Sequence, residues 1–170
     1  KSIHDIDPFN TLVDLNRAGI PLLEIVSEPE IKNGEEAYSY LSEIRKLVRY
    51  LEISDGNMEE GSLRADLNIS VRKKGTTKFG TKVEVKNMNS FRNVQKAIDF
   101  EIIRQIDLIE GGTPIFQETR TFDAVKNCTI GLRTKEDAHD YRYFPEPDLV
   151  PVIVPSSYVA EVRETMPPLP

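Results

Sequence analysis

The sequence predicts an α+β domain in which an antiparallel sheet is flanked by helices, and three observations predict it. Apolar residues recur at helical spacing in two long segments, residues 33–50 and 90–110. Apolar and polar residues instead alternate along residues 62–71, as in a strand with one buried face. A shorter alternation at residues 82–86 follows a turn, which predicts an antiparallel partner for that strand.

The first expected elements are two short strands, residues 11–16 and 21–27. They are separated by residues 17–19, where Gly19 can supply the positive φ that a tight turn needs. We therefore expect a hairpin or another tight strand connection in this part of the chain.

An amphipathic helix is expected next. Asn33 can cap its first turn, and Glu36 stands three residues later, as in a capping box. Apolar residues then recur at helical spacing to the end of the helix near Tyr50: Ala37, Tyr40, Leu41, Ile44, Leu47, Val48 and Leu51. The opposite face is charged and is interpreted as solvent-exposed.

The alternation along residues 62–71 has an unusual polar side. Its apolar side is expected to face the core and consists of Leu63, Ala65, Leu67, Ile69 and Val71. Its polar side presents hydroxyl, guanidinium, carboxylate and amide groups from Ser62, Arg64, Asp66, Asn68 and Ser70. Residues 73–76 form the turn, and the partner strand alternates valines with Lys82, Glu84 and Lys86. The polar sides of both strands are therefore expected to lie on one face of the sheet.

A second long helix is expected between a cap at Asn89 or Ser90 and two glycines at residues 111–112. Its expected buried stripe is Phe91, Val94, Ile98, Ile102, Ile106 and Ile109. Residues 115–122 and 129–133 predict two more strands.

The end of the chain has a different composition. Seven of the eleven prolines fall within residues 145–170, so this part is expected to run extended, with one short helix beginning near Ser156. We therefore assign residues 1–150 to one domain and residues 151–170 to an extended connector with a short helix.

Composition excludes several classes of protein. Hydrophobic residues make up 39% of the chain and charged residues 29%, which is typical of a globular protein. No apolar run approaches the roughly 18 residues of a membrane-spanning helix, so no membrane partner is expected. Cys128 is the single cysteine, which excludes an internal disulfide and fits a reducing cytoplasm. The chain contains no zinc-binding motif and no glycine-rich phosphate loop, so a nucleotide would have to bind on a sheet face.

Basic residues are concentrated in one stretch of an acidic chain. The net charge is −6, yet residues 72–86 hold six basic residues against one acid, Glu84. Such a stretch is either a solvated hairpin tip or a basic edge that contacts nucleic-acid phosphates.

The polar sides of the two strands carry the residue types that phosphoryl transfer needs. Carboxylate and amide oxygens are ligands for Mg²⁺, and arginine and lysine neutralise charge on a moving phosphoryl group. Glu59 and Glu60 lie just before the first strand and add further carboxylates. The alternative is a hydrogen-bonded polar face that packs on another domain. Residues 140–148, rich in aromatic and charged side chains, are either a structural loop or a further part of the site.

Several long strings in this sequence resemble one family. They are residues 13–29 (VDLNRAGIPLLEIVSEP), 58–64 (MEEGSLR), 84–91 (EVKNMNSF), 117–120 (QETR) and 139–148 (HDYRYFPEPD). In this order they resemble the GatB family, the B subunits of the aspartyl/glutamyl-tRNA(Asn/Gln) amidotransferases. The resemblance covers nearly the whole chain.

The resemblance implies an activity, cofactors and partners. In this family, a glutaminase A subunit supplies ammonia, and the B subunit uses Mg-ATP to phosphorylate the side-chain carboxylate of Glu or Asp carried by a misacylated tRNA. Ammonia then displaces phosphate to form the amide, and a small C subunit holds the other two together. The implied cofactors are ATP and Mg²⁺, the implied fold resembles the glutamine synthetase-like catalytic fold, and residues 1–150 would be part of that cradle domain.

The resemblance also implies which residues form the site. Arg64, Lys86, Asp66 and Ser62 would be catalytic, with Arg64 and Lys86 stabilising charge on the phosphoryl group. Glu60 and Glu84 would bind the metal. The nucleotide would be held by a larger set: Glu59, Asn68, Asn87, Asn89 and, from the later loop with Tyr141, Arg142.

Two further expectations complete the hypothesis. In the family, an acidic segment that supplies metal ligands precedes the part matched by Lys1, so the chain alone is expected to be inactive. The alternative from another class is a noncatalytic RNA-binding or subunit-interaction module.

Overall fold

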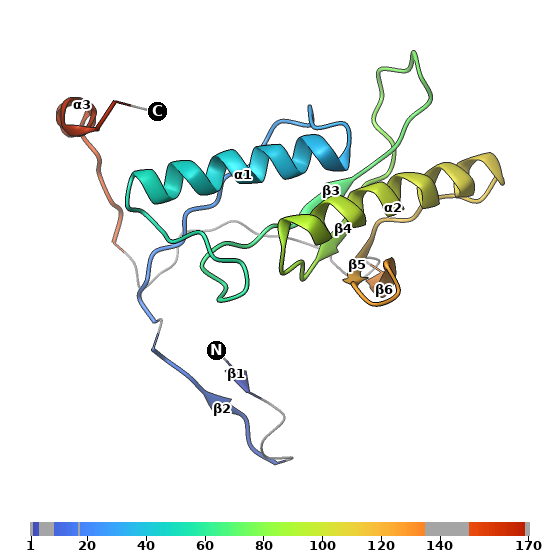
Figure 1. The fold of residues 1–170 in the computed structure, drawn as a ribbon, viewed down its shortest axis with the longest axis horizontal. Coiled ribbons are helices and arrows are strands. Elements are labelled where there is room, and N and C mark those ends of the chain that lie inside the picture. The colour runs from blue at the N-terminus through green and yellow to red at the C-terminus, as the bar shows by residue number, and fades with distance from the viewer. Residues whose placement is uncertain (1, 4–8, 17, 135–149, 169–170) are drawn as a thin grey trace. The chain divides into compact units, whose positions relative to one another are not determined.

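The computed structural model describes residues 2–3, 9–16, 18–134 and 150–168 of the chain, drawn in Figure 1. The chain divides into two compact units, residues 1–30 and residues 31–170, and each is described by itself. In the part of the chain that is described, no helix is long and apolar enough to cross a membrane.

The first unit contains a short antiparallel strand pair, in which β1 (Ser2–Ile3) pairs with β2 (Leu12–Val13). The expected hairpin between residues 11–16 and 21–27 is therefore wrong, because β2 pairs with an upstream segment and residues 21–27 form no strand. A strand needs a partner for its backbone groups, so an apolar run does not create one by itself. Gly19 does adopt the expected positive φ, +79°.

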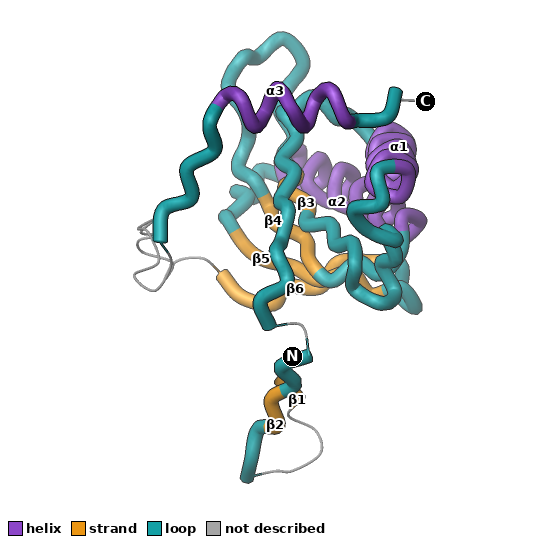
Figure 2. Tube along the Cα trace, turned by 90° about the vertical axis from the view of Figure 1, so that its left-hand side faces the viewer, coloured by secondary structure: helices purple, strands orange, loops and turns teal. Residues whose placement is uncertain are grey.

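The second unit is built on a four-stranded sheet with the order β3–β4–β5–β6, seen in Figure 2. The strands are β3 (Leu67–Ile69), β4 (Val83–Lys86), β5 (Glu118–Asp123) and β6 (Cys128–Thr134). The pairs β3–β4 and β5–β6 are antiparallel, whereas β4 and β5 are parallel. The expectation of an antiparallel sheet is therefore corrected to a mixed sheet within an α+β fold.

The parallel pair has a simple physical cause. The 20-residue helix α2 (Phe91–Glu110) connects β4 to β5 and carries the chain back to the edge where β4 began. Parallel strands require such a crossover connection, whereas a short turn would have made the pair antiparallel.

The helices begin at the expected caps. In α1 (Gly34–Tyr50), the Asn33 Oδ1 atom accepts a hydrogen bond from the Glu36 backbone N–H at 2.8 Å. In α2, the Ser90 Oγ atom accepts from the Asn93 N–H at 3.2 Å. The short helix expected near Ser156 is α3 (Ser156–Thr165). These elements confirm the sequence predictions, since caps and apolar periodicity act over only a few residues.

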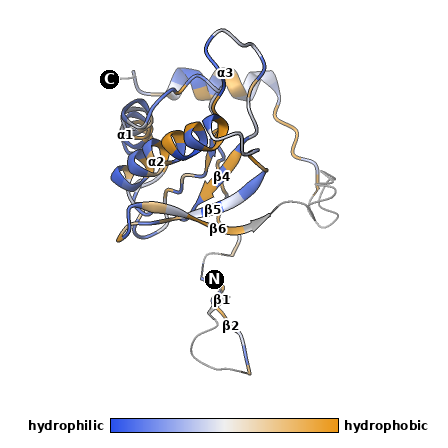
Figure 3. Cartoon of the chain, turned by 90° about the vertical axis from the view of Figure 1, so that its right-hand side faces the viewer, coloured by the Kyte–Doolittle hydropathy of each residue, from blue (hydrophilic) through white to orange (hydrophobic). Residues whose placement is uncertain are grey.

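The second unit is layered, with α2 packed against the sheet and α1 packed against α2. Figure 3 shows polar and apolar residues mixed along β4 and β5, as expected for strands whose two faces differ. Helices α1 and α2 approach closely at Gly34, where a Cβ atom would lie 2.6 Å from the Gln95 carbonyl oxygen. The buried apolar core between these layers consists of Ala37, Ile69, Val85, Met88, Val94, Ala97, Ile98 and Phe122.

The alternation along residues 62–71 is confirmed by burial, although only β3 forms a hydrogen-bonded strand within it. Ile69 is buried, and the other expected core residues of this segment are partly buried. The residues between them are exposed from Ser62 to Asn68. The sequence therefore predicted which side of this segment faces the helices.

The expected apolar stripe of α2 is wrong in its second half. Ile106 and Ile109 are 40% and 36% exposed, while Glu101 and Gln105 are completely buried. Glu101 pairs here with Arg120 of β5, and Gln105 donates a hydrogen bond to Glu101, so these two buried polar side chains have partners. Strand β5 and its neighbour β6 coincide with the two strands expected after α2, with shifted ends.

Candidate functional site

Strands β3 and β4 bring polar residues together on the sheet face turned away from α2. In their antiparallel register, Asn68 is the partner of Glu84 and Leu67 is the partner of Val85. Val83 and Val85 are completely buried, so the alternating side chains of Glu84 and Lys86 point to the opposite face. The expectation that both polar sides share one face is therefore confirmed.

A connected row of side chains on this face runs from Asp66, directly before β3, across β4 to β5. The Lys86 Nζ atom lies 3.3 Å from Glu84 Oε1 and 3.5 Å from Asp66 Oδ2. The Thr119 hydroxyl on β5 donates a hydrogen bond to Glu84 Oε2 at 2.9 Å. We call Asp66, Lys86, Glu84 and Thr119 the polar row.

The electrostatics of the polar row keep Lys86 charged. Its pKa is raised, first by the hydrogen bond to Glu84 and then by the negative charge of Asp66, which together outweigh partial burial. The side chain of Lys86 is 36% exposed, so the ammonium remains accessible from solvent. The sheet therefore presents a fixed cation held between two carboxylates.

A turn leading into β3 carries the expected acidic residues. Glu59 and Glu60 are exposed, and the Glu59 N–H donates to the Asn57 side chain at 3.0 Å. Gly61 then takes a φ of +76°, which only glycine adopts readily. The pKa of the Asp55 carboxyl is lowered, first by the hydrogen bond from the Asn57 backbone N–H and then by the hydrogen bond with the Ser62 side chain.

The two expected asparagines follow β4 directly. Asn87 has a positive φ, +65°, and Met88 after it is buried in the core, so the chain turns sharply here toward α2. Asn89 accepts a hydrogen bond from the Asn93 side chain at 2.7 Å. Asn87 and Asn89 are both exposed at the entry to α2.

The donor set of this face fits Mg²⁺ together with a phosphate group. Among the described residues, no group of three histidine, cysteine, aspartate or glutamate side chains is arranged to hold a metal ion. Mg²⁺ is usually held by only one or two carboxylates, with water and substrate phosphates completing its shell. Glu84 can supply such a carboxylate, while Lys86 can compensate phosphate charge beside it.

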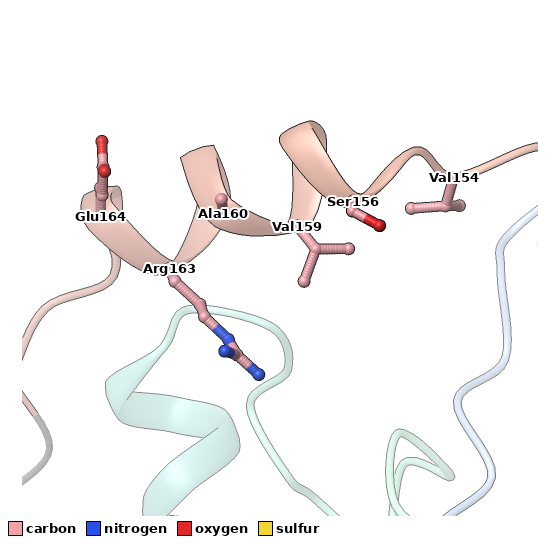
Figure 4. A pocket seen from close by; sticks show the side chains of 6 residues that line it. All are labelled: Val154, Ser156, Val159, Ala160, Arg163 and Glu164. Carbon is pink, nitrogen blue, oxygen red and sulfur yellow. The ribbon is translucent and has the colours of Figure 1, made fainter.

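Two hollows in the second unit lie elsewhere. One runs beside α3, where Figure 4 shows Val159 and Arg163 pointing to the same side of the helix. The other lies at the end of α2, between Ile109, Pro114 and the region around Gly80. Neither hollow is lined by a residue of the polar row or by another expected site residue, so these two hollows are separate from the polar row.

Comparison with known proteins identifies the family. Residues 1–160 match the model of the GatB/GatE catalytic domain. The chain belongs to this family. Over all 170 residues it is 56% identical to the B subunit of the aspartyl/glutamyl-tRNA(Asn/Gln) amidotransferase from Pelagibacter ubique. It is 58% identical to the proteins of the same name from Alkalilimnicola ehrlichii and Chlorobaculum tepidum.

The chain corresponds to only part of those GatB relatives. It spans 35% of the length of the Pelagibacter protein and 36% of the other two. The family resemblance expected from the sequence strings is thus confirmed for the catalytic domain of GatB and GatE proteins.

The structure brings some of the expected GatB site residues together. Asp66 and Glu84 each contact Lys86, and Asn68 is the cross-strand neighbour of Glu84. Arg64 is exposed on the same polar side of the segment. The other expected residues of the described part, Glu59, Glu60, Ser62, Asn87 and Asn89, lie in the flanking turns. Arg142, with Tyr141, lies outside the described residues.

Sequence reasoning missed Thr119 of the polar row. Residues 117–120 belong to the strings that resemble GatB, but the sequence alone suggests no role for them. On β5, threonines at positions 119 and 121 alternate with charged residues, Glu118 and Arg120. That alternation indicates a two-sided strand and could have drawn attention to Thr119.

Proposed function

We propose that this chain is part of the catalytic domain of a tRNA-dependent amidotransferase B subunit. The proposed reaction uses Mg-ATP to phosphorylate the side-chain carboxylate of Glu on tRNA(Gln) or Asp on tRNA(Asn), and ammonia from a glutaminase A subunit then gives the amide. A small C subunit is the third proposed partner. The names of the GatB relatives support the reaction, and the observation that carries it is the polar row, where an accessible ammonium is fixed beside carboxylates.

The residues of the sheet face suit this reaction. Lys86 and Arg64 would neutralise negative charge on the phosphoryl group and on the carboxylate that receives it. The raised pKa of Lys86 keeps that ammonium protonated at neutral pH. Glu84 and Glu60 would provide oxygen ligands for Mg²⁺, which when bound shields the charge of the phosphates.

The remaining expected residues would contact the nucleotide or the acyl group. Asp66 contacts Lys86 in addition to Glu84, so it would help to orient the ammonium. Ser62, Glu59, Asn68, Asn87 and Asn89, with Arg142, are proposed to contact ATP. A glutamine synthetase-like cradle remains the proposed frame for these contacts.

The test uses the full-length B subunit in its assembled complex. We expect Arg64→Ala and Glu84→Gln to lower ATP-dependent amide formation by about 10²-fold, the usual cost of removing one preorganised electrostatic contact. Glutamine hydrolysis should persist, because it belongs to the glutaminase. Amide formation from aminoacylated tRNA and glutamine hydrolysis are measured separately.

Matched controls come from the exposed face of α1. Glu43 and Lys46 form a solvent-exposed ion pair at 2.6 Å, far along the chain from the polar row. Glu43→Gln and Lys46→Ala repeat the same changes in charge and should leave amide formation within about twofold of the unchanged protein. Near-normal amide formation in both Arg64→Ala and Glu84→Gln would overturn the proposed site.

A further inference from the structure

Thr119 contacts Glu84, although the proposed function gives Thr119 no role. Its side chain is on the polar face, yet the residue is only 2% exposed. Its hydroxyl donates to Glu84 Oε2 at 2.9 Å, while Glu84 Oε1 faces Lys86 at 3.3 Å. The two oxygens of one carboxylate therefore have different neighbours, and the side chain of Glu84 is held in one orientation.

The position of Thr119 is itself held from the other face of the sheet. A register shift in the β5–β6 pair falls between Thr119 and Arg120, and such bulges redirect side chains. The Arg120 side chain lies on the face of the sheet that α2 covers, where its guanidinium donates hydrogen bonds to the Thr129 carbonyl at 2.9 Å and to the Glu118 carboxylate at 2.9 Å. Strand β5 is therefore fixed on its buried side while it presents Thr119 on the polar side.

We propose that Thr119 is a positioning residue that orients the Glu84 carboxylate for metal and phosphate binding. This inference rests on the proposed function. Removal of the hydroxyl would take this donor away from Oε2 of Glu84, so the carboxylate would be held in its orientation by fewer contacts. Partners that orient a metal-binding carboxylate typically change metal affinity or activity 10- to 100-fold when they are removed.

The experiment compares Thr119→Val, which removes the hydroxyl but keeps the branched shape, with Thr119→Ser, which keeps the hydroxyl. Both are made in the full-length protein within its complex. Binding of Mn²⁺ without nucleotide is measured by electron paramagnetic resonance, and the KM for ATP and the kcat of amide formation are measured separately. We expect Thr119→Val to weaken Mn²⁺ binding or lower kcat about tenfold or more, and Thr119→Ser to stay within about twofold.

Two controls show whether the effect passes through Glu84. Thr121 lies two residues along the same strand, and its hydroxyl makes no hydrogen bond with the residues that the structure describes. Thr121→Val should therefore leave both readouts within about twofold. In a Glu84→Gln background, Thr119→Val should add no more than about twofold, because residues that act as one unit are not additive.

The outcomes separate this inference from the proposed function. Unchanged Mn²⁺ binding and kcat in Thr119→Val would overturn it, and so would equal losses in the valine and serine variants. Near-normal amide formation in both Arg64→Ala and Glu84→Gln would instead overturn the proposed function of the site. If Thr119→Val does not fold, Thr119→Ala compared with Thr119→Ser makes the same test.

Discussion

Glu101 of α2 is an ionised carboxylate that is buried between this helix and the sheet. It is completely buried on α2, and Arg104 binds both of its oxygens at 2.9 Å. The hydroxyl of Thr129 also donates to it, and Arg120 lies 3.1 Å away. Burial alone would raise the pKa of Glu101, but the hydrogen bonds outweigh burial and the pKa is lowered.

This lowered pKa predicts how stability depends on pH. The contribution of Glu101 is complete above the ordinary glutamate pKa of 4.5 and is lost as the pH falls through the lowered folded-state pKa. Glu101→Gln should destabilise the protein at pH 7 by about 3 kcal/mol, since it leaves two partly buried arginines without one partner. It should also flatten the acid side of the stability curve below that pH.

Chemical unfolding of the full-length protein between pH 3 and 8 measures both effects of Glu101→Gln. The exposed substitution Glu43→Gln serves as the control, because its carboxylate lies on the surface of α1. An unchanged free energy of unfolding at neutral pH would contradict the structural role of the buried ion pairs.

Among the elements, the hairpin tip between β3 and β4 has a defined shape and exposed lysines. Arg72 contacts other residues of the tip. It donates a hydrogen bond to the Thr77 carbonyl at 2.6 Å, and its guanidinium lies 4.6 Å from the centre of the Phe79 ring. Thr76 closes the turn by donating to the Lys73 carbonyl at 2.7 Å. The lysines of the tip are all exposed to solvent: Lys73, Lys74, Lys78 and Lys82.

We predict that this tip contacts tRNA phosphates in the full-length complex. Replacement of Lys73 and Lys74 by alanine should weaken tRNA binding, and the slope of log K against log salt should decrease by about 1 for each phosphate interaction that is removed. Binding is measured by titration at several salt concentrations. The double alanine variant of Lys32 and Lys46 makes the same change in charge elsewhere, and an unchanged salt slope in the Lys73/Lys74 variant would favour a solvated tip.

For the molecule as a whole, we expect the proposed metal site to need ligands beyond the described residues. No group of three metal-binding side chains occurs among them, and Glu59, Glu60, Asp66 and Glu84 all carry charge that repels a triphosphate. We therefore predict that the 170-residue chain alone binds Mg-ATP at least about tenfold more weakly than the full-length protein. Calorimetric titration of both proteins measures this, and equal micromolar binding would show that the residues named here suffice.

The sequence by itself determined the features that depend on near neighbours. Periodicity and caps placed α1 and α2, and alternation identified which side of residues 62–71 faces the core. Because one turn joins two such alternating segments, the meeting of Asp66 with Lys86 could also be predicted. The family resemblance came from strings of consecutive residues, which need no fold to be compared.

Only the tertiary structure decided which distant segments meet. It paired β5 parallel to β4, buried Glu101 where an apolar stripe was expected, and placed the Thr119 hydroxyl on a carboxylate 35 residues earlier in the chain. Local propensities act over a few residues, whereas such contacts depend on how helices and strands pack as complete units. The orientation of Glu84 is therefore a property of the folded sheet, because its partner is supplied by a strand that reaches it only through the α2 crossover.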